Sequence, residues 1–464
     1  TYELVNTFGE MKNWNIIEEL YEDEIMELTV TIYELVDEHI QYYILEMHDP
    51  LFKDKFCYDI CEFFLDQWCD AELYEDNEDN FHYLYKFVLS IIDDYFGLTY
   101  HWRRIPLRSR QHFVEEINKK EITQKISNIR SIPQPEQRTS EWYKFRHNLI
   151  TASNLGKIFG TESSLNSLIY EKCCPLKEEQ DSSYVNTQSP LHWGQKYEPV
   201  SVMLYEKLYN TKVEDFGCIQ HKDYTFIGAS PDGINVDSNS DRYGRMLEIK
   251  NIVNREIDGI PSKNYWIQMQ VQMETCELEK CDFLETRFKE YEENEFYDDE
   301  HNEKGVILYF VEKISIGESN DSQTGYPLAQ QYSGKPHYEY MPLHLSKAKE
   351  DVEKWIEETR AKLRRSWSLY STLYYYLDEL SCVLVERNRV WFEAAIVEIQ
   401  KTWETIEKER ESGYEHRAAK KRIKSPLEVV QSTENSDNKI IKNLPISGGI
   451  CLVKLDRDDI NPEN

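Results

Sequence analysis

The chain has 464 residues, a formal net charge of −31, and a composition that is 40% hydrophobic and 13% aromatic. This composition excludes a disordered protein, and the length suffices for roughly two or three domains. The acidic balance argues against tight non-specific binding to DNA, although DNA contact requires a local basic groove rather than a basic total.

The chain holds no run of 18 or more apolar residues and no signal-peptide pattern. We therefore expect no membrane span and no membrane partner, and a soluble, intracellular protein of the cytoplasm or nucleus. The ten cysteines lack the paired spacing of a metal site: Cys173 and Cys174 are adjacent, and Cys276 and Cys281 have no second pair. Buried thiols in a reducing compartment are expected.

Residues 1–135 are predicted to form an acidic helical accessory domain. Residues 1–100 contain four Lys, no Arg and 25 acidic residues, and their apolar residues recur at helical spacing. The acidic surface is a solvated face, a protein-docking surface or a mimic that keeps DNA away. The basic segment His101–Gln111 contacts phosphates or pairs with the acidic domain, and Pro133 and Pro135 mark the domain boundary.

Residues 139–160 are predicted to form two short helices. Thr139 or Ser140 caps the first, and Ser153 begins the second, which ends at Gly160. The N–H groups at the second helix start, together with Arg146, form a candidate phosphate site. The alternative is a salt-bridged Arg146 and a simple cap at Ser153.

A polar, Ser-rich loop over 176–190 precedes a predicted helix that begins near Trp193 and carries Glu198 in an early turn. An acid there complements the helix dipole, which is the alternative to a functional role.

Residues 226–250 are the centre of the predicted site. Two strand-like runs flank the polar segment Asn235–Gly244, as in a long hairpin. Period-two alternation places Glu248 and Lys250 on one face of the second strand, and pairing of the strands brings Asp232 beside Glu248. Carboxylates that converge in this way suit Mg²⁺ or Mn²⁺, and a nearby Lys positions a water or neutralises developing charge. The alternative is an exposed surface pair of little consequence.

Residues 265–274 are predicted to form a helix with Gln268 and Gln272 on one side, where their amides orient a water or a phosphate, or form a polar surface. Residues 281–286 and 305–311 are predicted strands. From Ser346 we predict a long helix that continues through Tyr374–Tyr376, then a final helix that includes Trp391 and Trp403. Residues 413–464 are predicted to be a largely flexible tail.

The motif Ser230-Pro231-Asp232, followed by Glu248-Ile249-Lys250, resembles the signature of the PD-(D/E)xK nuclease superfamily. The Trp-x-x-x-Arg motif that ends at Arg146, the Ile-Thr-Ala-Ser motif that ends at Ser153, the Gly-x-x-x-Glu motif that ends at Glu198 and the Gln-x-Gln helix are similar to the lambda-exonuclease-like group. That group includes the YqaJ-like viral recombinase nucleases. The resemblance covers roughly residues 137–312 well and 340–405 loosely.

The resemblance implies an α/β fold: a restriction-endonuclease-like core with a central mixed β-sheet flanked by helices. The core spans 136–345 and follows the N-terminal all-helical domain, and a C-terminal helical extension spans 346–412 and packs on the core. The implied activity is a divalent-metal-dependent DNA exonuclease that digests double-stranded ends from the 5′ side in viral-type recombination and repair. The alternatives are a structure-specific endonuclease on the same core and a catalytically idle DNA- or protein-binding adaptor.

The resemblance also implies roles for individual residues. Asp232, Glu248 and Glu198 hold Mg²⁺ or Mn²⁺, Lys250 assists the attacking water, and Gln268 is catalytic, with Gln270 and Gln272 secondary. The 5′-phosphate is bound by Arg146, Ser153 and Ser230. No iron–sulfur cluster is expected. The implied partners are duplex DNA ends, a single-strand annealing protein and two further copies of the chain in a ring. A viral protein would work at the site of viral replication.

Overall fold

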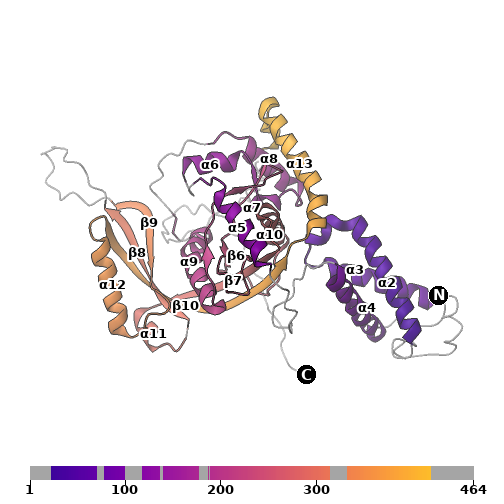
Figure 1. Ribbon diagram of the computed structural model, residues 1–464, viewed down its shortest axis with the longest axis horizontal. Helices are drawn as coiled ribbons and strands as arrows, with labels where there is room; N and C mark the ends of the chain where they lie inside the picture. Colours follow the sequence, from indigo (N-terminus) through magenta and orange to yellow (C-terminus); the bar gives the residue numbers. More distant parts are fainter. Residues whose placement is uncertain are drawn as a thin grey trace, which may run out of the picture. The chain divides into compact units, whose positions relative to one another are not determined.

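The computed structural model describes residues 22–70, 78–99, 118–135, 139–176, 186–187, 189–301, 303–313 and 332–419. These residues form an α/β fold whose large central sheet is mixed and has helices on both faces (Figure 1). The predicted fold class is confirmed. The basic segment His101–Gln111, most of the loop 176–190 and the tail from residue 420 lie outside the described residues.

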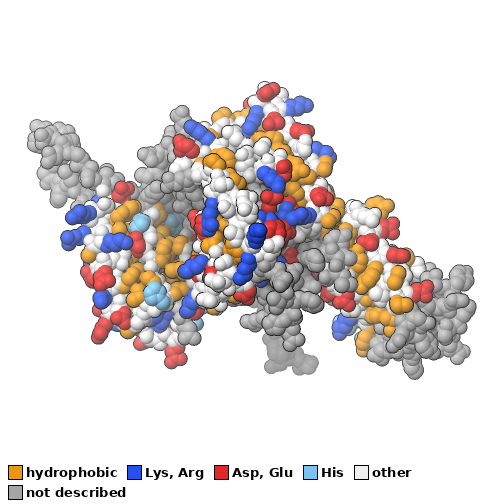
Figure 2. Space-filling view, in the orientation of Figure 1, with side chains coloured by type: hydrophobic (Ala, Val, Ile, Leu, Met, Phe, Trp, Pro, Cys, Tyr) orange, Lys and Arg blue, Asp and Glu red, His pale blue; other side chains and the backbone are white. Residues whose placement is uncertain are grey.

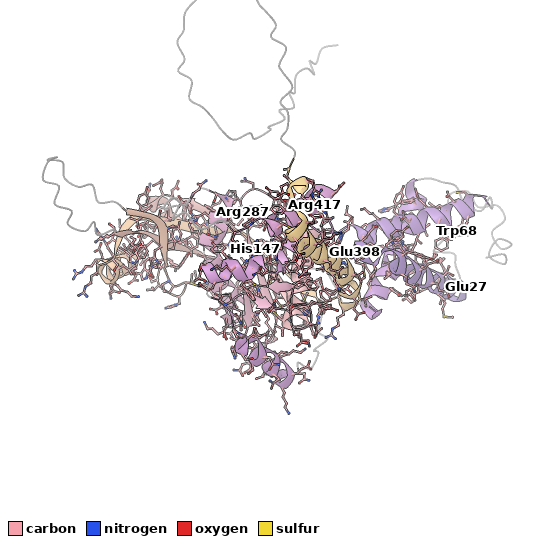
Figure 3. All side chains as sticks on the ribbon, turned by 90° about the horizontal axis from the view of Figure 1, so that it is seen from above. Glu27, Trp68, His147, Arg287, Glu398 and Arg417 are labelled. Carbon is pink, nitrogen blue, oxygen red and sulfur yellow. The ribbon has the colours of Figure 1, made fainter. Side chains whose placement is uncertain are left out.

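The N-terminal part is helical, as predicted. It consists of α2 (Glu22–Tyr43), η2 (Ile44–His48), α3 (Phe52–Asp70) and α4 (Glu78–Thr99), and Glu27 and Trp68 mark it in Figure 3. Its buried side chains include Ile32, Val36, Phe56, Leu84 and Val88. The short η2 contacts the rest of the fold, because the Trp391 indole N–H donates a hydrogen bond to the Leu45 carbonyl oxygen at 3.4 Å.

The central sheet has the strand order β2-β5-β6-β7-β10-β8-β9. Its strands are β2 (Val213–Glu214), β5 (Gly233–Asn235), β6 (Met246–Asn251), β7 (Lys280–Tyr291), β8 (Lys304–Lys313), β9 (Tyr332–Tyr340) and β10 (Trp367–Glu386). In the described part of this seven-stranded sheet, β6 and β7 are the only strands that pair in parallel. A smaller sheet has the order β1-β4-β3, with β1 (Ile150–Thr151), β3 (Ile219–Gln220) and β4 (Ile227–Ala229).

Two helices cover opposite faces of the central sheet around β6. Helix α9 (Pro190–Tyr209) packs on the face that carries Leu247 and Ile249. Helix α10 (Lys263–Cys276) packs on the face that carries Met246 and Phe283. Since side chains alternate along a strand, Glu248 lies on the same face as Met246 and points towards α10. The sheet therefore directs the predicted acid of β6 into a buried interface.

The prediction of a continuous helix through Tyr374–Tyr376 is wrong. Helix α12 (Lys349–Leu363) ends, and Trp367 begins the 20-residue strand β10, which pairs with β8 in its first half and with β7 along most of its length. Aromatic and β-branched residues favour a strand once neighbours are available for pairing. The predicted final helix is present as α13 (Arg389–Ser412), which Glu398 marks in Figure 3.

The segments on either side of β1 confirm one predicted helix and correct the other. Thr139 caps α6 (Ser140–His147) through a hydrogen bond that its hydroxyl accepts from the Trp142 N–H. The next helix, α7 (Ala152–Leu155), has four residues, with Ser153 inside its first turn rather than at its start. It ends before Gly156, which lies so close to Asn264 of α10 that a Cβ atom would clash. A separate helix, α8 (Glu162–Cys173), follows.

The described residues also form the helices α5 (Lys119–Ser131) and α11 (Glu293–Asp298) and the 3-10 helix η4 (Glu415–Arg417). Among the helices of the described ranges, none combines the length and apolar character that crossing a lipid bilayer requires.

Replacing Gly244 by Ala is expected to lower the free energy of unfolding by about 1–3 kcal/mol. Gly244 has a φ angle of +80°, and an added Cβ would meet the Ile122 side chain of α5. Chemical denaturation measures the change. The matched control is Gly194→Ala in α9, where an added Cβ meets no atom within 4 Å. Equal stabilities of the two variants would contradict the prediction.

Candidate active site

The hairpin between β5 and β6 places Asp232 beside Glu248. Gly233 pairs with Leu247 across the two antiparallel strands. The Asp232 N–H donates to the Leu247 carbonyl oxygen at 3.1 Å, and the Ile249 N–H donates to Asp232 Oδ2 at 2.6 Å. The backbone of β6 therefore fixes the Asp232 carboxylate, as the predicted pairing of the two strands requires.

Glu248 is the buried centre of the site, with 0% of its side chain exposed. Lys250 forms an ion pair with Glu248 Oε1, and Gln268 Nε2 donates to the same oxygen at 2.8 Å. Gln272 Nε2 donates to Glu248 Oε2 at 2.8 Å. Three donors thus compensate for removing a carboxylate from water.

The electrostatics of the site depend on its crowding. Burial, followed by the charge of Glu248, raises the pKa of Asp232 well above its usual range, and Glu198 adds to the shift. Lys250 acts in the opposite direction on Asp232. Burial opposes the charge on Lys250 itself, but Glu248 and Asp232 together raise its pKa, so the ammonium stays protonated. The site therefore carries more negative charge than its one lysine neutralises, which is a setting that favours a further cation.

Glu198 lies on α9, and its side chain is exposed. Its charge adds to the rise in the pKa of Asp232, after the larger effects of burial and Glu248. Within the described ranges, no group of three or more His, Cys, Asp and Glu side chains lies close enough together to hold a metal ion. Asp232, Glu248 and Glu198 nevertheless form a set of hard oxygen donors of the kind that Mg²⁺ and Mn²⁺ prefer. These residues therefore fit such an ion in chemistry and charge. For all three carboxylates to coordinate one ion, at least one of them has to move towards the others.

Two of the three predicted phosphate-binding residues lie at neighbouring strand ends. Strands β1 and β4 pair in parallel, with Thr151 opposite Gly228, and Ser153 and Ser230 each follow two residues later. Ser153 is exposed and its hydroxyl lies 3.2 Å from that of Thr151. Ser230 is partly exposed, and its carbonyl oxygen accepts a hydrogen bond from Gln272 at 3.3 Å.

Arg146, the third of them, lies in the last turn of α6 with its guanidinium 4.4 Å from the centre of the Trp142 ring. Its carbonyl oxygen accepts a hydrogen bond from Lys172 Nζ at 2.7 Å, and burial lowers the pKa of Lys172 to about 8. Arg410 of α13 donates to the His147 carbonyl oxygen at 2.9 Å. Cationic side chains at the end of α6 therefore hold the turn that carries Arg146.

The structure adds residues that sequence reasoning ranked low or did not find. Gln272 contacts Glu248 as closely as Gln268 does, and its position four residues along the helix was the available signal. Gln270 is structural, since its amide accepts from the Asn388 N–H at 2.6 Å and donates to the Glu386 carbonyl oxygen.

Glu285 of β7 is a further buried acid, directly opposite Lys250 in the parallel pair of strands. It forms an ion pair with Arg255, and its Oε2 atom has no hydrogen-bond partner among the described residues. Burial raises the pKa of Glu285, while Arg255 acts in the opposite direction. Only the strand pairing reveals this residue, because no motif contains it.

Comparison with known proteins confirms the resemblance over the segment that carries the site. Residues 141–279 match the family model of the YqaJ-like viral recombinase domain. An uncharacterized protein of Acanthamoeba polyphaga mimivirus is 29% identical over 310 residues, which are 60% of this chain and 54% of that protein. The chain thus aligns with about half the length of this relative.

Solved structures of similar proteins include an alkaline exonuclease from Laribacter hongkongensis, described alone and in complex with dAMP. The two structures are 17% and 18% identical to this chain. Each comparison covers 59% of this chain and 95% of the other, with a TM-score of 0.33.

Proposed function

We propose that this chain, whose residues 141–279 match the YqaJ-like viral recombinase domain, is a divalent-metal-dependent deoxyribonuclease. In this proposal it hydrolyses phosphodiesters at double-stranded DNA ends, as an exonuclease that proceeds from the 5′ end. The observation that carries the proposal is the meeting of Asp232, Glu248 and Lys250 on paired strands inside the matched segment. Two carboxylates and an ammonium in this arrangement are suited to phosphoryl chemistry.

Asp232 and Glu248, joined by Glu198, would hold one or two Mg²⁺ or Mn²⁺ ions. A bound ion supplies stabilisation of the negative charge that develops on the phosphate oxygens. The negative charge around Asp232 supports this assignment, because a cation relieves the repulsion from Glu248 and Glu198 that adds to burial in raising the pKa of Asp232.

Lys250 has two tasks in the proposed reaction. Its protonated Nζ atom orients the attacking water and neutralises charge near the scissile phosphate. Gln268 and Gln272 hold Glu248 from the α10 side, so that the carboxylate keeps its orientation when Lys250 turns towards the substrate. Glu248 remains satisfied through the amides in that case.

Arg146, Ser153 and Ser230 are the proposed anchors of the terminal 5′-phosphate. Two hydroxyls at adjacent strand ends and a guanidinium on the preceding helix match the acceptor oxygens of a phosphate. The single-strand annealing protein and the ring of three subunits stay predictions, because the structure contains one chain.

The test is digestion of linear duplex DNA that carries a label at either the 5′ or the 3′ end, with closed circular DNA of the same sequence alongside. Mg²⁺-dependent loss of nucleotides from the 5′-ended strand, with intact circles, is the expected result. Cleavage of circles would replace the proposal by a structure-specific endonuclease. A folded chain that cuts neither substrate with Mg²⁺ or Mn²⁺ would favour the catalytically idle adaptor.

A further inference from the structure

The outer part of the central sheet, formed by β8, β9 and the first half of β10, has two different faces. Leu308 and Phe310 of β8 point towards α12 and pack with Val352 in a closed apolar cluster. Side chains alternate along β8, so Tyr309 lies on the opposite face. That face is covered at one end by α9, and its remaining length carries tyrosines.

Three tyrosines from three neighbouring strands form a continuous surface on this face, which we call the tyrosine face. Tyr309 of β8 pairs with Tyr338 of β9, and their ring centroids lie 5.2 Å apart. Tyr370 of β10 lies 4.9 Å from Tyr309, at an irregularity of the strand pairing between Leu369 and Ser371. Tyr370 is 70% exposed, and Tyr309 and Tyr338 are partly exposed. A β-strand irregularity of this kind redirects a side chain outwards.

The tyrosine face is joined to the candidate active site through α9. The Tyr338 hydroxyl lies 2.6 Å from His192 Nε2 at the start of that helix. The hydroxyl of Tyr340, two residues further along β9, donates to the Lys196 carbonyl oxygen at 2.8 Å. Burial raises the pKa of Tyr340, and the charges of Tyr338 and then Glu198 add to the shift. The proposed metal ligand Glu198 is therefore an electrostatic neighbour of the sheet that carries the tyrosines.

Basic side chains lie at the end of β8 and in the turn that leads into β10. Lys313 ends β8, and its Nζ atom donates to the Arg364 carbonyl oxygen at 2.7 Å in the turn between α12 and β10. Arg364 and Arg365 in this turn are exposed. Figure 2 shows hydrophobic, histidine and basic side chains, with acidic ones among them, over the region that Figure 1 labels β8, β9 and α12. In a chain with a net charge of −31, a local basic group of this kind reduces the repulsion that a polyanion meets.

We infer that the tyrosine face binds single-stranded DNA by stacking its bases on Tyr309, Tyr338 and Tyr370, with the basic end contacting phosphates. This inference rests on the proposed function, because digestion of one strand of a duplex end leaves the complementary strand unpaired. Aromatic rings on an open sheet stack with unpaired bases of any sequence, whereas the bases of a duplex are already stacked on one another. The contacts of Tyr338 and Tyr340 with α9 place this face beside the helix that carries Glu198.

The test is equilibrium binding of a fluorescein-labelled single-stranded DNA of mixed sequence to the full chain, measured by anisotropy with a chelator so that no cleavage occurs. Tyr370→Ala and Tyr309→Ala are each expected to weaken binding by about 5- to 100-fold, the loss of one stacked base. Tyr370→Phe keeps the ring and is expected to bind like the wild type. The matched control is Tyr42→Ala, because Tyr42 is 75% exposed on α2, away from this sheet.

Photocrosslinking of the same DNA, substituted with 5-iodouracil, identifies the contacted peptide. The expected crosslinks map to β8, β9 or the start of β10. Unchanged affinity in both alanine variants, or crosslinks confined to other elements, would overturn the inference. Weaker binding by Tyr42→Ala to the same extent as by Tyr370→Ala would overturn it as well, because the loss would not be local.

The outcomes separate this inference from the proposed function. If the chain digests duplex ends but binds single-stranded DNA equally well with and without Tyr370, that result contradicts only the inference that the tyrosine face binds single-stranded DNA. If the chain binds single-stranded DNA through the tyrosines but cuts no DNA with any divalent metal, that result contradicts only the proposed nuclease activity. Binding is measured without metal, so neither result depends on the other.

Discussion

The variant Lys250→Met is expected to lose cleavage of linear duplex DNA by about a hundred- to a thousand-fold, the usual effect of removing one group that stabilises transition-state charge. Lys250 contacts Glu248 directly and lies 4.8 Å from the Tyr265 ring, so its Nζ atom is held at the carboxylates. Methionine keeps the length of the side chain and removes the charge. Initial rates of nucleotide release with saturating Mg²⁺ measure the effect.

The control for this variant is Lys222→Met, since Lys222 forms an exposed ion pair with Glu277. It is expected to cleave at the wild-type rate. Circular dichroism and thermal unfolding verify that Lys250→Met is folded, which is expected because Gln268 and Gln272 still donate to Glu248. A folded Lys250→Met protein with wild-type activity would refute the assigned role of Lys250.

The variant Asp282→Leu is expected to lower the free energy of unfolding by about 3–5 kcal/mol, because it leaves a buried guanidinium without its partner. Asp282 is completely buried on the α9 side of β7 and forms ion pairs with Arg242 and Arg245. It also accepts a hydrogen bond from the Tyr205 hydroxyl at 2.6 Å. These contacts fasten the loop between β5 and β6, and with it Asp232, to the sheet. Denaturant unfolding measures the loss.

Two further variants test whether the loss of stability comes from the buried charge that Asp282→Leu leaves unpaired. Lys222→Ala removes an exposed ion pair and is expected to cost less than about 1 kcal/mol. The double variant Asp282→Leu with Arg242→Met removes both buried charges and is expected to be more stable than Asp282→Leu alone. If Asp282→Leu were no less stable than Lys222→Ala, the network would not fasten the loop.

Local sequence patterns were sufficient to predict much of the candidate site. The two-residue spacing of Glu248 and Lys250 requires a common face on any strand, and the four-residue spacing of Gln268 and Gln272 requires a common side on any helix. The structure brings these four residues into contact. Such predictions succeed because the backbone geometry alone decides them.

The errors concern segments whose conformation depends on distant partners. Tyr374–Tyr376 lie in a strand because β7 and β8 flank β10 on both sides, and those strands are distant in the sequence. The helix predicted to begin at Ser153 ends at Leu155, and the next residue, Gly156, packs closely against Asn264 of α10. Neither contact has a local signal, since hydrogen bonding and packing with remote segments outweigh the small local propensities.

By itself, the sequence determined the acidic helical N-terminal part, the hairpin with Asp232, Glu248 and Lys250, and the glutamines that face them. The tertiary structure decided the place of β10 in the sheet, the buried acids Asp282 and Glu285, and the open face with Tyr309 and Tyr370. The division has one physical reason. Period and spacing follow from the covalent geometry of one segment, whereas burial, charge pairing and open surface depend on which segments the fold brings together.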